Sequence, residues 1–336
     1  MRPDVTSQVV VNGRFLARRL TGVERYGREI LRYVGINCRV ESTRRQGWMG
    51  HAWEQFILPT KLDQNSILWS PANTGPLLIR EQALTLHDLS PLEHPEWFQT
   101  NFANWYRLFL PLLARRVQTV FTPSEYVKRK IAARFGLEHV TVTPNGVDCS
   151  IFHPDAKQSK FDLPACYVLF VGTLEPRKNL EVLLRAWDEI KDDFRETWLV
   201  IVGVNGNVFR NVNYQPPTER VRFLGYVDDE TLAGLYANAT LFVLPSREEG
   251  FGLPALEAMA SGTPVIVSDG GALPEVVGEA GLIFCLSEPD GLKNALRECL
   301  SNAGLRSALK EKGLHRARKF SWQTTAQLVW KSLNET

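Results

Sequence analysis

The stretch Leu241-Phe-Val-Leu-Pro-Ser-Arg-Glu-Glu-Gly-Phe-Gly-Leu-Pro-Ala-Leu-Glu257 passes from an apolar run through a polar loop into a helix. The apolar residues 241–244 predict a buried strand that ends at Pro245. Because Pro is favoured at the first position of a helix, we expect the next helix to begin near Pro254. Strand, loop and helix together form the repeating unit of a parallel α/β sheet.

The loop of this unit has the residues expected of a site for anions and hydroxyl groups. Gly250 and Gly252 let a ligand approach the backbone closely, and the N-terminus of the following helix attracts anions. Glu249 lies in the loop and Glu257 is expected in the first helical turn, where carboxylates accept hydrogen bonds from a diol. For one glutamate, an ordinary helix start is the simpler explanation, but the full string is much rarer. The loop therefore predicts a ligand with a phosphate group and sugar hydroxyls.

The alternation of strands and helices extends along most of the chain, except for the weakly patterned residues 34–66. Continuous apolar strands separated by helices indicate parallel sheets covered on both faces. Strands are expected within 9–11, 67–69, 83–86, 117–121, 140–142, 167–171, 198–202, 221–224, 241–244, 264–267 and 282–284.

A change of composition at 149–166, where Pro, Lys, Asp and Ser cluster, predicts a linker between domains. The sequence thus predicts an α/β protein with two Rossmann-like domains that face a central cleft, residues 1–155 and 156–320. A final helix within 321–336 is expected to pack back onto the first domain. In open α/β sheets, ligands bind beyond the carboxyl ends of the strands, where the motifs of this chain lie.

Composition excludes several classes of protein. A net charge of +2 over 336 residues gives no support for nucleic-acid binding. We find no apolar run long enough to cross a bilayer, and the first residues lack the apolar core of a signal peptide. Five cysteines without a C-x-x-C pair are typical of buried thiols in a reducing compartment. We expect a cytoplasmic protein, either soluble or located at the inner face of the membrane.

A second motif, Gly172-Thr-Leu-Glu-Pro-Arg-Lys-Asn179, follows the strand at 167–171 and precedes a helix. Arg177 and Lys178 stand before a helix N-terminus, where the dipole repels cations, so an anion is needed beside them. A phosphate or pyrophosphate satisfies this need, although a solvated basic loop is the simpler alternative. No G-x-G-x-x-G follows the first strand and no P-loop exists, which disfavours a dehydrogenase and a P-loop ATPase.

These two motifs, with Ala258-Met-Ala-Ser-Gly-Thr-Pro-Val265 and Pro144-Asn-Gly-Val-Asp148, resemble the retaining glycosyltransferases of family 4, which have the two-domain GT-B architecture. Within that family the chain looks most like bacterial polysaccharide mannosyltransferases. Thr21-Gly-Val-Glu-Arg-Tyr26 and His87-Asp-Leu-Ser-Pro-Leu-Glu-His-Pro-Glu-Trp97 carry this narrower resemblance.

The resemblance implies a role for each matching residue. Arg177 and Lys178 would bind the donor diphosphate, Glu257 the ribose hydroxyls and Glu249 the hydroxyls of the transferred sugar. His87, from the first domain, would reach the donor sugar, although a lone His at a strand end is more often structural. Tyr226 and Val227 would read the base. The other donor contacts implied are Gly22, Gly172, Gly250, Phe251, Gly252 and Leu253.

The implied reaction moves a hexose, mannose by preference, from a nucleotide diphosphate sugar such as GDP-mannose to a polysaccharide or lipid-linked glycan. It uses no cofactor and, since the chain lacks an Asp-x-Asp pair, no metal. Retention is expected from same-face attack assisted by the leaving phosphate. Two alternatives stay open: a nucleotide-sugar isomerase of the same architecture, and an inactive nucleotide-sugar-binding subunit.

The segment 97–116 is rich in aromatic residues and ends with Arg115 and Arg116. A basic aromatic helix of this kind docks on anionic membranes. The alternative is an aromatic stripe that faces the core and leaves a solvated basic face.

Overall fold

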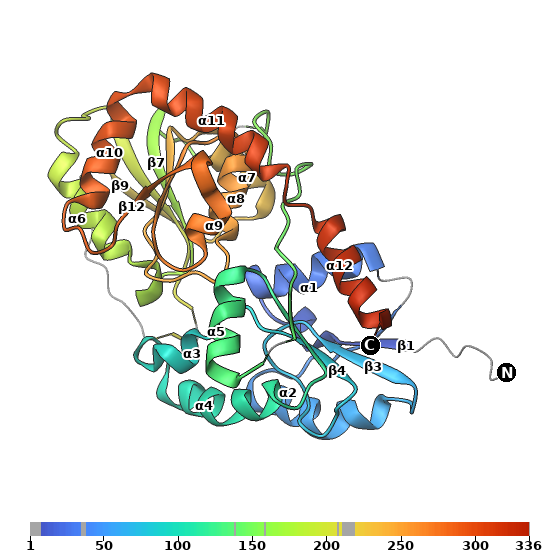
Figure 1. Cartoon of the computed structure of the whole chain (residues 1–336). Helices are drawn as coiled ribbons and strands as arrows, with labels where there is room; N and C mark the ends of the chain where they lie inside the picture. Colours follow the sequence, from blue (N-terminus) through green and yellow to red (C-terminus); the bar gives the residue numbers. More distant parts are fainter. Residues whose placement is uncertain are drawn as a thin grey trace. The chain divides into compact units, whose positions relative to one another are not determined.

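The computed structural model describes residues 8–34, 38–137, 139–157, 159–206, 208–209 and 219–335. The chain divides into two compact units, each with a six-stranded sheet whose paired neighbours are parallel (Figure 1). The predicted α/β class is confirmed. The first unit consists of Met1–Glu93, Asn101–Gly146 and Ser321–Thr336, and the second of His94–Thr100 and Val147–Phe320.

In the first sheet the strand order is β2-β1-β3-β4-β5-β6. Since β2 and β3 flank β1 on opposite sides, the order reverses between β1 and β3. The strands are β1 (Gln8–Asn12), β2 (Cys38–Glu41), β3 (Ser66–Ser70), β4 (Gln82–Thr85), β5 (Thr119–Thr122) and β6 (Val140–Val142).

The helices of the first unit bury a core against which the aromatic residues between 102 and 109 pack. Tyr106 and Phe109 are buried with Leu110 and Leu113, and Phe102 and Trp105 pack against them. The aromatic stripe thus faces the core, as the second interpretation of this segment proposed. The helices are α1 (Gly22–Val34), α2 (Gly47–Ala52), α3 (Ser90–Glu93), α4 (Thr100–Ala114), α5 (Glu125–Phe135) and α12 (Trp322–Glu335), with the short turns η1 (Gly13–Ala17), η3 (Trp53–Ile57) and η4 (Leu58–Lys61).

In the second sheet the order is β12-β11-β10-β7-β8-β9. The four central strands are apolar and almost wholly buried. The strands are β7 (Cys166–Val171), β8 (Thr197–Val202), β9 (Val221–Gly225), β10 (Leu241–Leu244), β11 (Val265–Ser268) and β12 (Gly281–Phe284). The helices are α6 (Leu180–Ile190), α7 (Asp229–Asn238), α8 (Leu253–Ala260), α9 (Leu273–Val277), α10 (Gly291–Ser301) and α11 (Ala303–Ala317), with the turns η5 (Pro95–Trp97), η6 (Pro176–Lys178) and η7 (Gly278–Ala280).

The chain passes from one unit to the other at positions that its composition did not indicate. Phe152, inside the expected linker, is buried and packs edge-on against Tyr236 of α7. Residues 147–152 are therefore already part of the second unit. Residues 94–100 also belong to that unit, because Phe98 pairs with Phe209 there. At the end of the chain, α12 packs against α1 within the first unit.

Cys149 and Cys166 are exposed, whereas buried thiols were expected. The exposure follows from their positions, in the segment joining the units and at the first residue of β7. No helix among the described residues combines the length and the apolar composition needed to cross a bilayer.

Candidate active site

The loops after β7 and β10 meet at the carboxyl edge of the second sheet. β7 and β10 are neighbours, although β8 and β9 come between them in the chain and lie on the other side of β7. The strand order therefore reverses between β7 and β10, and ligands of open α/β sheets bind at such a reversal. The two motifs predicted from sequence occupy these two loops.

Glu249 stands at the centre of this edge, between two cations. Lys178 Nζ lies 2.5 Å from Glu249 Oε1, and Arg177 Nη1 lies 2.9 Å from Oε2. Ser246 Oγ donates to Glu249 Oε1 at 2.6 Å. A second carboxylate, that of Glu175, accepts from Arg177 Nη2 at 2.8 Å. We call Glu175, Arg177, Lys178, Ser246 and Glu249 the switch-point cluster.

The two carboxylates of the cluster differ in their electrostatics. Burial alone would raise the pKa of Glu249, but Lys178 and Arg177 outweigh it and lower that pKa to about 2. For Glu175 burial dominates, so its pKa is raised despite the neighbouring Arg177. Glu249, which is 5% exposed, is therefore an ionised hydrogen-bond acceptor at neutral pH.

The cluster supplies the anion that Arg177 and Lys178 were expected to need. Because Glu249 occupies this place, a phosphate that binds the same cations competes with a carboxylate of the protein. Asn179 precedes α6 in a left-handed conformation, and its side chain does not cap that helix. It accepts from Arg247 Nε at 3.2 Å and donates to the Pro245 carbonyl at 3.1 Å. Asn179 thus ties the two loops together.

Two glycines fix the backbone around Glu249. Gly271 has φ +70°, and a Cβ there would lie 2.5 Å from the backbone nitrogen of Glu249. Gly252 has φ +106°, and a Cβ there would lie 2.6 Å from Leu273 Cδ2. Residues with a Cβ rarely adopt such φ angles, and a Cβ at either position would also lie too close to a neighbouring atom. Both the angle and the lack of space therefore favour glycine.

Glu257 lies in the second turn of α8, not in the first as predicted. The helix begins at Leu253, one residue earlier than expected, because Gly252 in a left-handed conformation precedes it. Glu257 is buried, and Tyr236 Oη donates to its Oε2 at 3.3 Å. Its carboxylate is therefore hydrogen-bonded to a side chain of α7.

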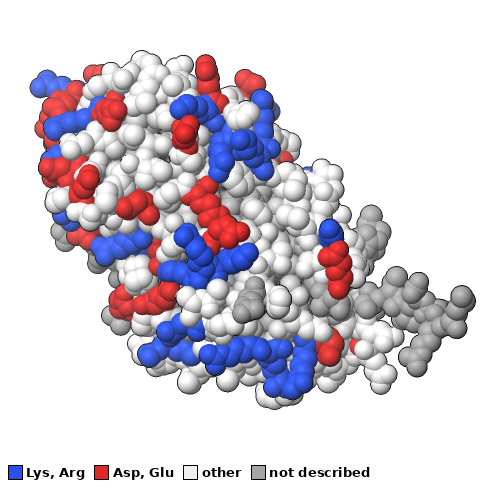
Figure 2. Space-filling model, in the orientation of Figure 1, with Lys and Arg blue, Asp and Glu red and all other residues white. Residues whose placement is uncertain are grey.

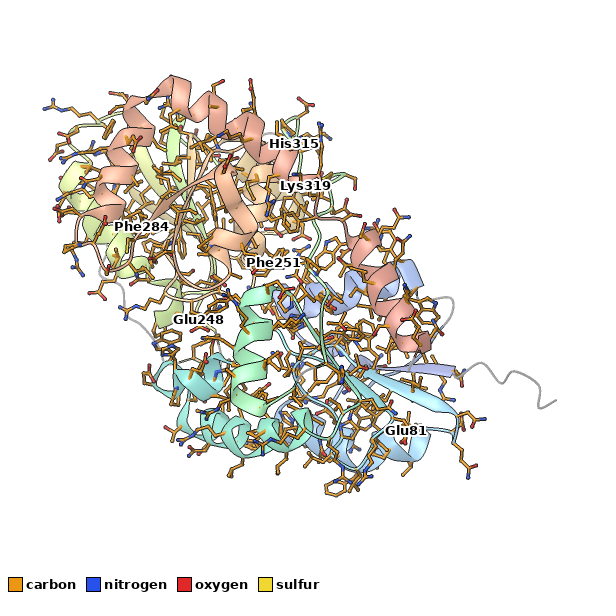
Figure 3. The ribbon with its side chains drawn as sticks, in the orientation of Figure 1. Glu81, Glu248, Phe251, Phe284, His315 and Lys319 are labelled. Atoms are coloured by element: carbon orange, nitrogen blue, oxygen red, sulfur yellow. The ribbon has the colours of Figure 1, made fainter. Side chains whose placement is uncertain are left out.

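The other residues implied to bind the donor divide into buried and exposed groups. Phe251 packs edge-on against Phe320 and is buried, as are Leu253 and Gly250. Figure 3 labels Phe251 together with Glu248 on the loop between β10 and α8. The buried members shape the loop, whereas the exposed ones are open to a ligand. Tyr226 is 57% exposed, Val227 is half-buried, and Gly172 lies against the alkyl stem of Lys178.

His87 and Gly22 belong to the first unit. His87 Nε2 donates to the Pro71 carbonyl at 2.8 Å, and Tyr26 packs edge-on against the His87 ring. Because the carbonyl only accepts, this bond leaves Nδ1 as the acceptor of a neutral ring. Burial lowers the pKa of His87, although the bond to Pro71 opposes the shift, so the ring is neutral at pH 7. Gly22 is the exposed first residue of α1.

A buried polar network at the carboxyl edge of the first sheet was not predicted. Arg14 Nη1 donates to Glu54 Oε2 at 3.0 Å and to Thr74 Oγ1 at 3.2 Å. Asn12 Nδ2 donates to Glu54 Oε1 at 2.7 Å. The network lies where the strand order of the first sheet reverses, since Asn12 ends β1 and Thr74 follows β3. These residues form no local motif, so only the sheet order reveals them.

A second unpredicted feature is the contact between His94 and Glu248. His94 Nε2 lies 3.2 Å from Glu248 Oε2, and the His94 ring stacks on Trp97 at 3.9 Å. Glu248 directly precedes Glu249, so residues 94–97 contact the loop that carries the switch-point cluster. In the described part of the chain, no group of three or more His, Cys, Asp and Glu side chains is placed to hold a metal ion.

Comparison with known proteins gives matches over both units. The family model described as Glycosyl transferases group 1 matches residues 153–316, and the model described as Glycosyltransferase Family 4 matches residues 69–151. The O-antigen chain mannosyltransferase B of Escherichia coli is 29% identical over 306 residues, which cover 87% of this chain and 77% of the relative. The O-antigen chain mannosyltransferase RfbU of Salmonella typhimurium is 30% identical over 251 residues, covering 73% of this chain and 68% of the relative.

The fold also matches solved structures. Sucrose-phosphate synthase from Thermosynechococcus elongatus superposes with a TM-score of 0.77 over 97% of this chain and 98% of the other, at 19% identity. A likeness at this identity concerns the fold alone. It confirms the class of fold predicted from the sequence.

Proposed function

The chain belongs to the group 1 glycosyltransferases, and from this membership we propose that it transfers mannose from GDP-mannose to a polysaccharide or lipid-linked glycan with retention of configuration. Two relatives named as mannosyltransferases support the choice of sugar. The observation that carries the proposal is the Glu249 carboxylate held between Arg177 and Lys178 at the reversal of the second sheet.

In this proposal Arg177 and Lys178 bind the donor diphosphate. Guanidinium and ammonium groups are the side chains that pair best with phosphate oxygens. As the bond from the sugar to the phosphate breaks, negative charge grows on the leaving diphosphate. Two fixed cations stabilise that charge more in the transition state than in the ground state, which lowers the barrier.

Glu249 is assigned to the hydroxyls of the transferred sugar. Its pKa of about 2 keeps the carboxylate ionised, so it accepts hydrogen bonds and has no proton to donate to the leaving group. Donor binding then exchanges partners, because phosphate oxygens replace Glu249 on the cations and sugar hydroxyls replace the cations on Glu249. The exchange pairs the cations with phosphate and leaves the Glu249 carboxylate hydrogen-bonded to sugar hydroxyls, which avoids the large penalty of a buried charge without a partner.

Retention is assigned to same-face attack, with the leaving phosphate taking the proton of the acceptor hydroxyl. A covalent route needs a carboxylate nucleophile and a partner acid on one sugar carbon. Glu249 is a poor candidate for the nucleophile, since in this proposal its carboxylate is taken up by hydroxyls of the transferred sugar once the donor binds. Glu175 is likewise bound to Arg177.

His87 is proposed to accept a hydrogen bond from a hydroxyl of the donor sugar. Its Nε2 proton is committed to Pro71, and Nδ1 is the remaining acceptor of a neutral ring. A neutral imidazole suits this role, because it adds no positive charge to compete with the cations that bind the diphosphate.

A panel of nucleotide sugars tests the identity of the donor. GDP-, UDP-, ADP- and dTDP-sugars are each added to the protein and its melting temperature is measured, because a ligand that binds only the folded state raises stability. We expect the largest rise with GDP-mannose. A larger rise with another donor would replace that assignment, and no rise with any of them would contradict a nucleotide-sugar site.

A second measurement separates transfer from isomerisation. The donor that raises the melting temperature is incubated with the protein and followed by proton NMR without acceptor. We expect the sugar to stay unchanged, apart from slow hydrolysis. Conversion to another nucleotide sugar would favour the isomerase.

A further inference from the structure

A hollow of about 670 Å³ lies on the surface of the first unit. It is formed where the loop before β4 meets the C-terminal end of α4. Its lining combines only two residue types, leucine and arginine. The lining residues are Leu77, Leu78, Arg80, Leu112, Arg115 and Arg116, which we call the Leu–Arg hollow.

The leucines of this region are unusually exposed. Leu78 is 71% and Leu112 is 61% exposed, and Leu108, one turn before Leu112 on α4, is 75% exposed. Single exposed leucines are common on protein surfaces, but a group around one hollow marks a site of interaction. The aromatic residues of α4 do not contribute to this surface, because they face the core.

The arginines make the surface positive. No acidic residue lines the hollow. Among the described residues, no acidic side chain forms an ion pair with Arg80, Arg115 or Arg116. Arg115 and Arg116 follow the end of α4, where the helix dipole favours cations. The helix dipole accounts for neither the position of Arg80 nor the exposure of the leucines. Figure 2 shows basic side chains gathered in a row over the part of the first unit where α4 runs in Figure 1.

We propose that the Leu–Arg hollow docks the protein on an anionic phospholipid bilayer. The leucines enter the boundary between headgroups and acyl chains, and the arginines pair with lipid phosphates. A second copy of the chain fits poorly, because a symmetric dimer would bring the same arginines face to face. The inference goes beyond the transfer reaction and does not depend on the identity of the donor.

Vesicle flotation tests the proposal without any activity assay. The full chain is mixed with vesicles of pure phosphatidylcholine and with vesicles of equal parts phosphatidylcholine and phosphatidylglycerol. We expect it to float with the anionic vesicles only, and raised salt should weaken this binding. Failure to bind the anionic vesicles would overturn the proposal.

Two variants locate the surface. Replacing Arg80, Arg115 and Arg116 by Ala should weaken binding on the order of a hundredfold, about fivefold for each arginine. The matched control replaces Arg185, Lys312 and Lys331 by Ala, which removes the same charge from exposed positions elsewhere and should change binding little. Equal binding by the two triple variants would contradict the assignment to this hollow.

The apolar part is tested with Leu78→Ser combined with Leu112→Ser. We expect binding to anionic vesicles to fall about tenfold or more, since two inserted side chains lose their apolar contact. Melting temperatures like that of the unaltered protein confirm that the variants fold, because these side chains are exposed. Unchanged binding by a folded double variant would contradict insertion of the leucines.

Discussion

Lys178 Nζ lies 2.5 Å from Glu249 Oε1, so the cation expected to meet a phosphate is already paired with a carboxylate of the protein. Arg177 shares the same carboxylate through its other oxygen. The pairing gives the buried Lys178 and the partly buried Arg177 a shared carboxylate partner, and it places the group assigned to the sugar directly beside the groups assigned to the diphosphate. Under the proposed function, stability and donor binding would therefore depend on the same residues.

Removal of Glu249 should destabilise the fold. Glu249→Ala leaves Lys178 and Arg177 without their shared counterion, and breaking a buried pair in this way typically costs about 3–5 kcal/mol. Urea unfolding measures the change in the free energy of unfolding. Glu181→Ala is the control, because Glu181 pairs with Arg185 on the surface, where such pairs contribute about 0–1 kcal/mol. Equal effects of the two substitutions would show that the cluster does not act as a buried unit.

The pH dependence of stability should report the same pairing. The ordinary pKa of a Glu side chain is 4.5, whereas in the folded protein that of Glu249 is about 2. A depressed pKa stabilises the fold above the unfolded value, so this contribution is complete above about pH 4.5 and is lost as the pH falls through 2. The shift corresponds to roughly 3 kcal/mol. Acid unfolding of the unaltered protein and of Glu249→Gln measures it, and parallel curves for the two proteins would contradict the shift.

Gly271→Ala should displace Glu249. The new Cβ would lie 2.5 Å from the Glu249 backbone nitrogen, at a residue with φ +70°. Gly136→Ala is a matched control, because Gly136 has φ +68° but open space around its Cβ position. We expect the control to lose about 1 kcal/mol of stability from its backbone angle alone. Gly271→Ala should lose more, together with most of its transfer activity, and similar losses in both variants would argue against this close packing.

Chelation of metal ions should leave transfer unaffected. Arg177 and Lys178 supply the positive charge that a divalent ion supplies in other transferases. Initial rates with the preferred donor are compared before and after treatment with EDTA, and again with added Mg²⁺. Rates that fall with EDTA and recover with Mg²⁺ would show that these two cations are not sufficient.

The sequence predicted the second unit better than the first, for a physical reason. Strands such as Tyr167–Val171 are buried on both faces and read as continuous apolar runs. β2 was missed, because Cys38–Glu41 lies at the edge of its sheet, half-exposed and with charged residues. A short strand of this kind buries little apolar surface and so leaves no recognisable apolar pattern.

Whether a contact in the site could be predicted depended on how far apart its two residues lie in the chain. The strand–loop–helix pattern placed Arg177, Lys178 and Glu249 at strand ends, but their mutual contact follows only from the neighbouring positions of β7 and β10. The polar network of the first unit is formed by hydrogen bonds between distant segments, and it links residues 12, 14, 54 and 74. The contacts of Asn179 are of the same kind, because its side chain bonds to Arg247 and Pro245 of the other loop and does not cap α6.

Initial rates of sugar transfer by Lys178→Ala and Arg177→Ala test the central claim most directly. The donor is the one that most raises the melting temperature of the unaltered protein, and Arg185→Ala, exposed on α6, is the control. We predict a fall of about a hundredfold or more in each site variant, the scale of a lost charge contact in the transition state, and little change in the control. Full activity in a folded Lys178→Ala protein would contradict the assignment of the diphosphate to these cations.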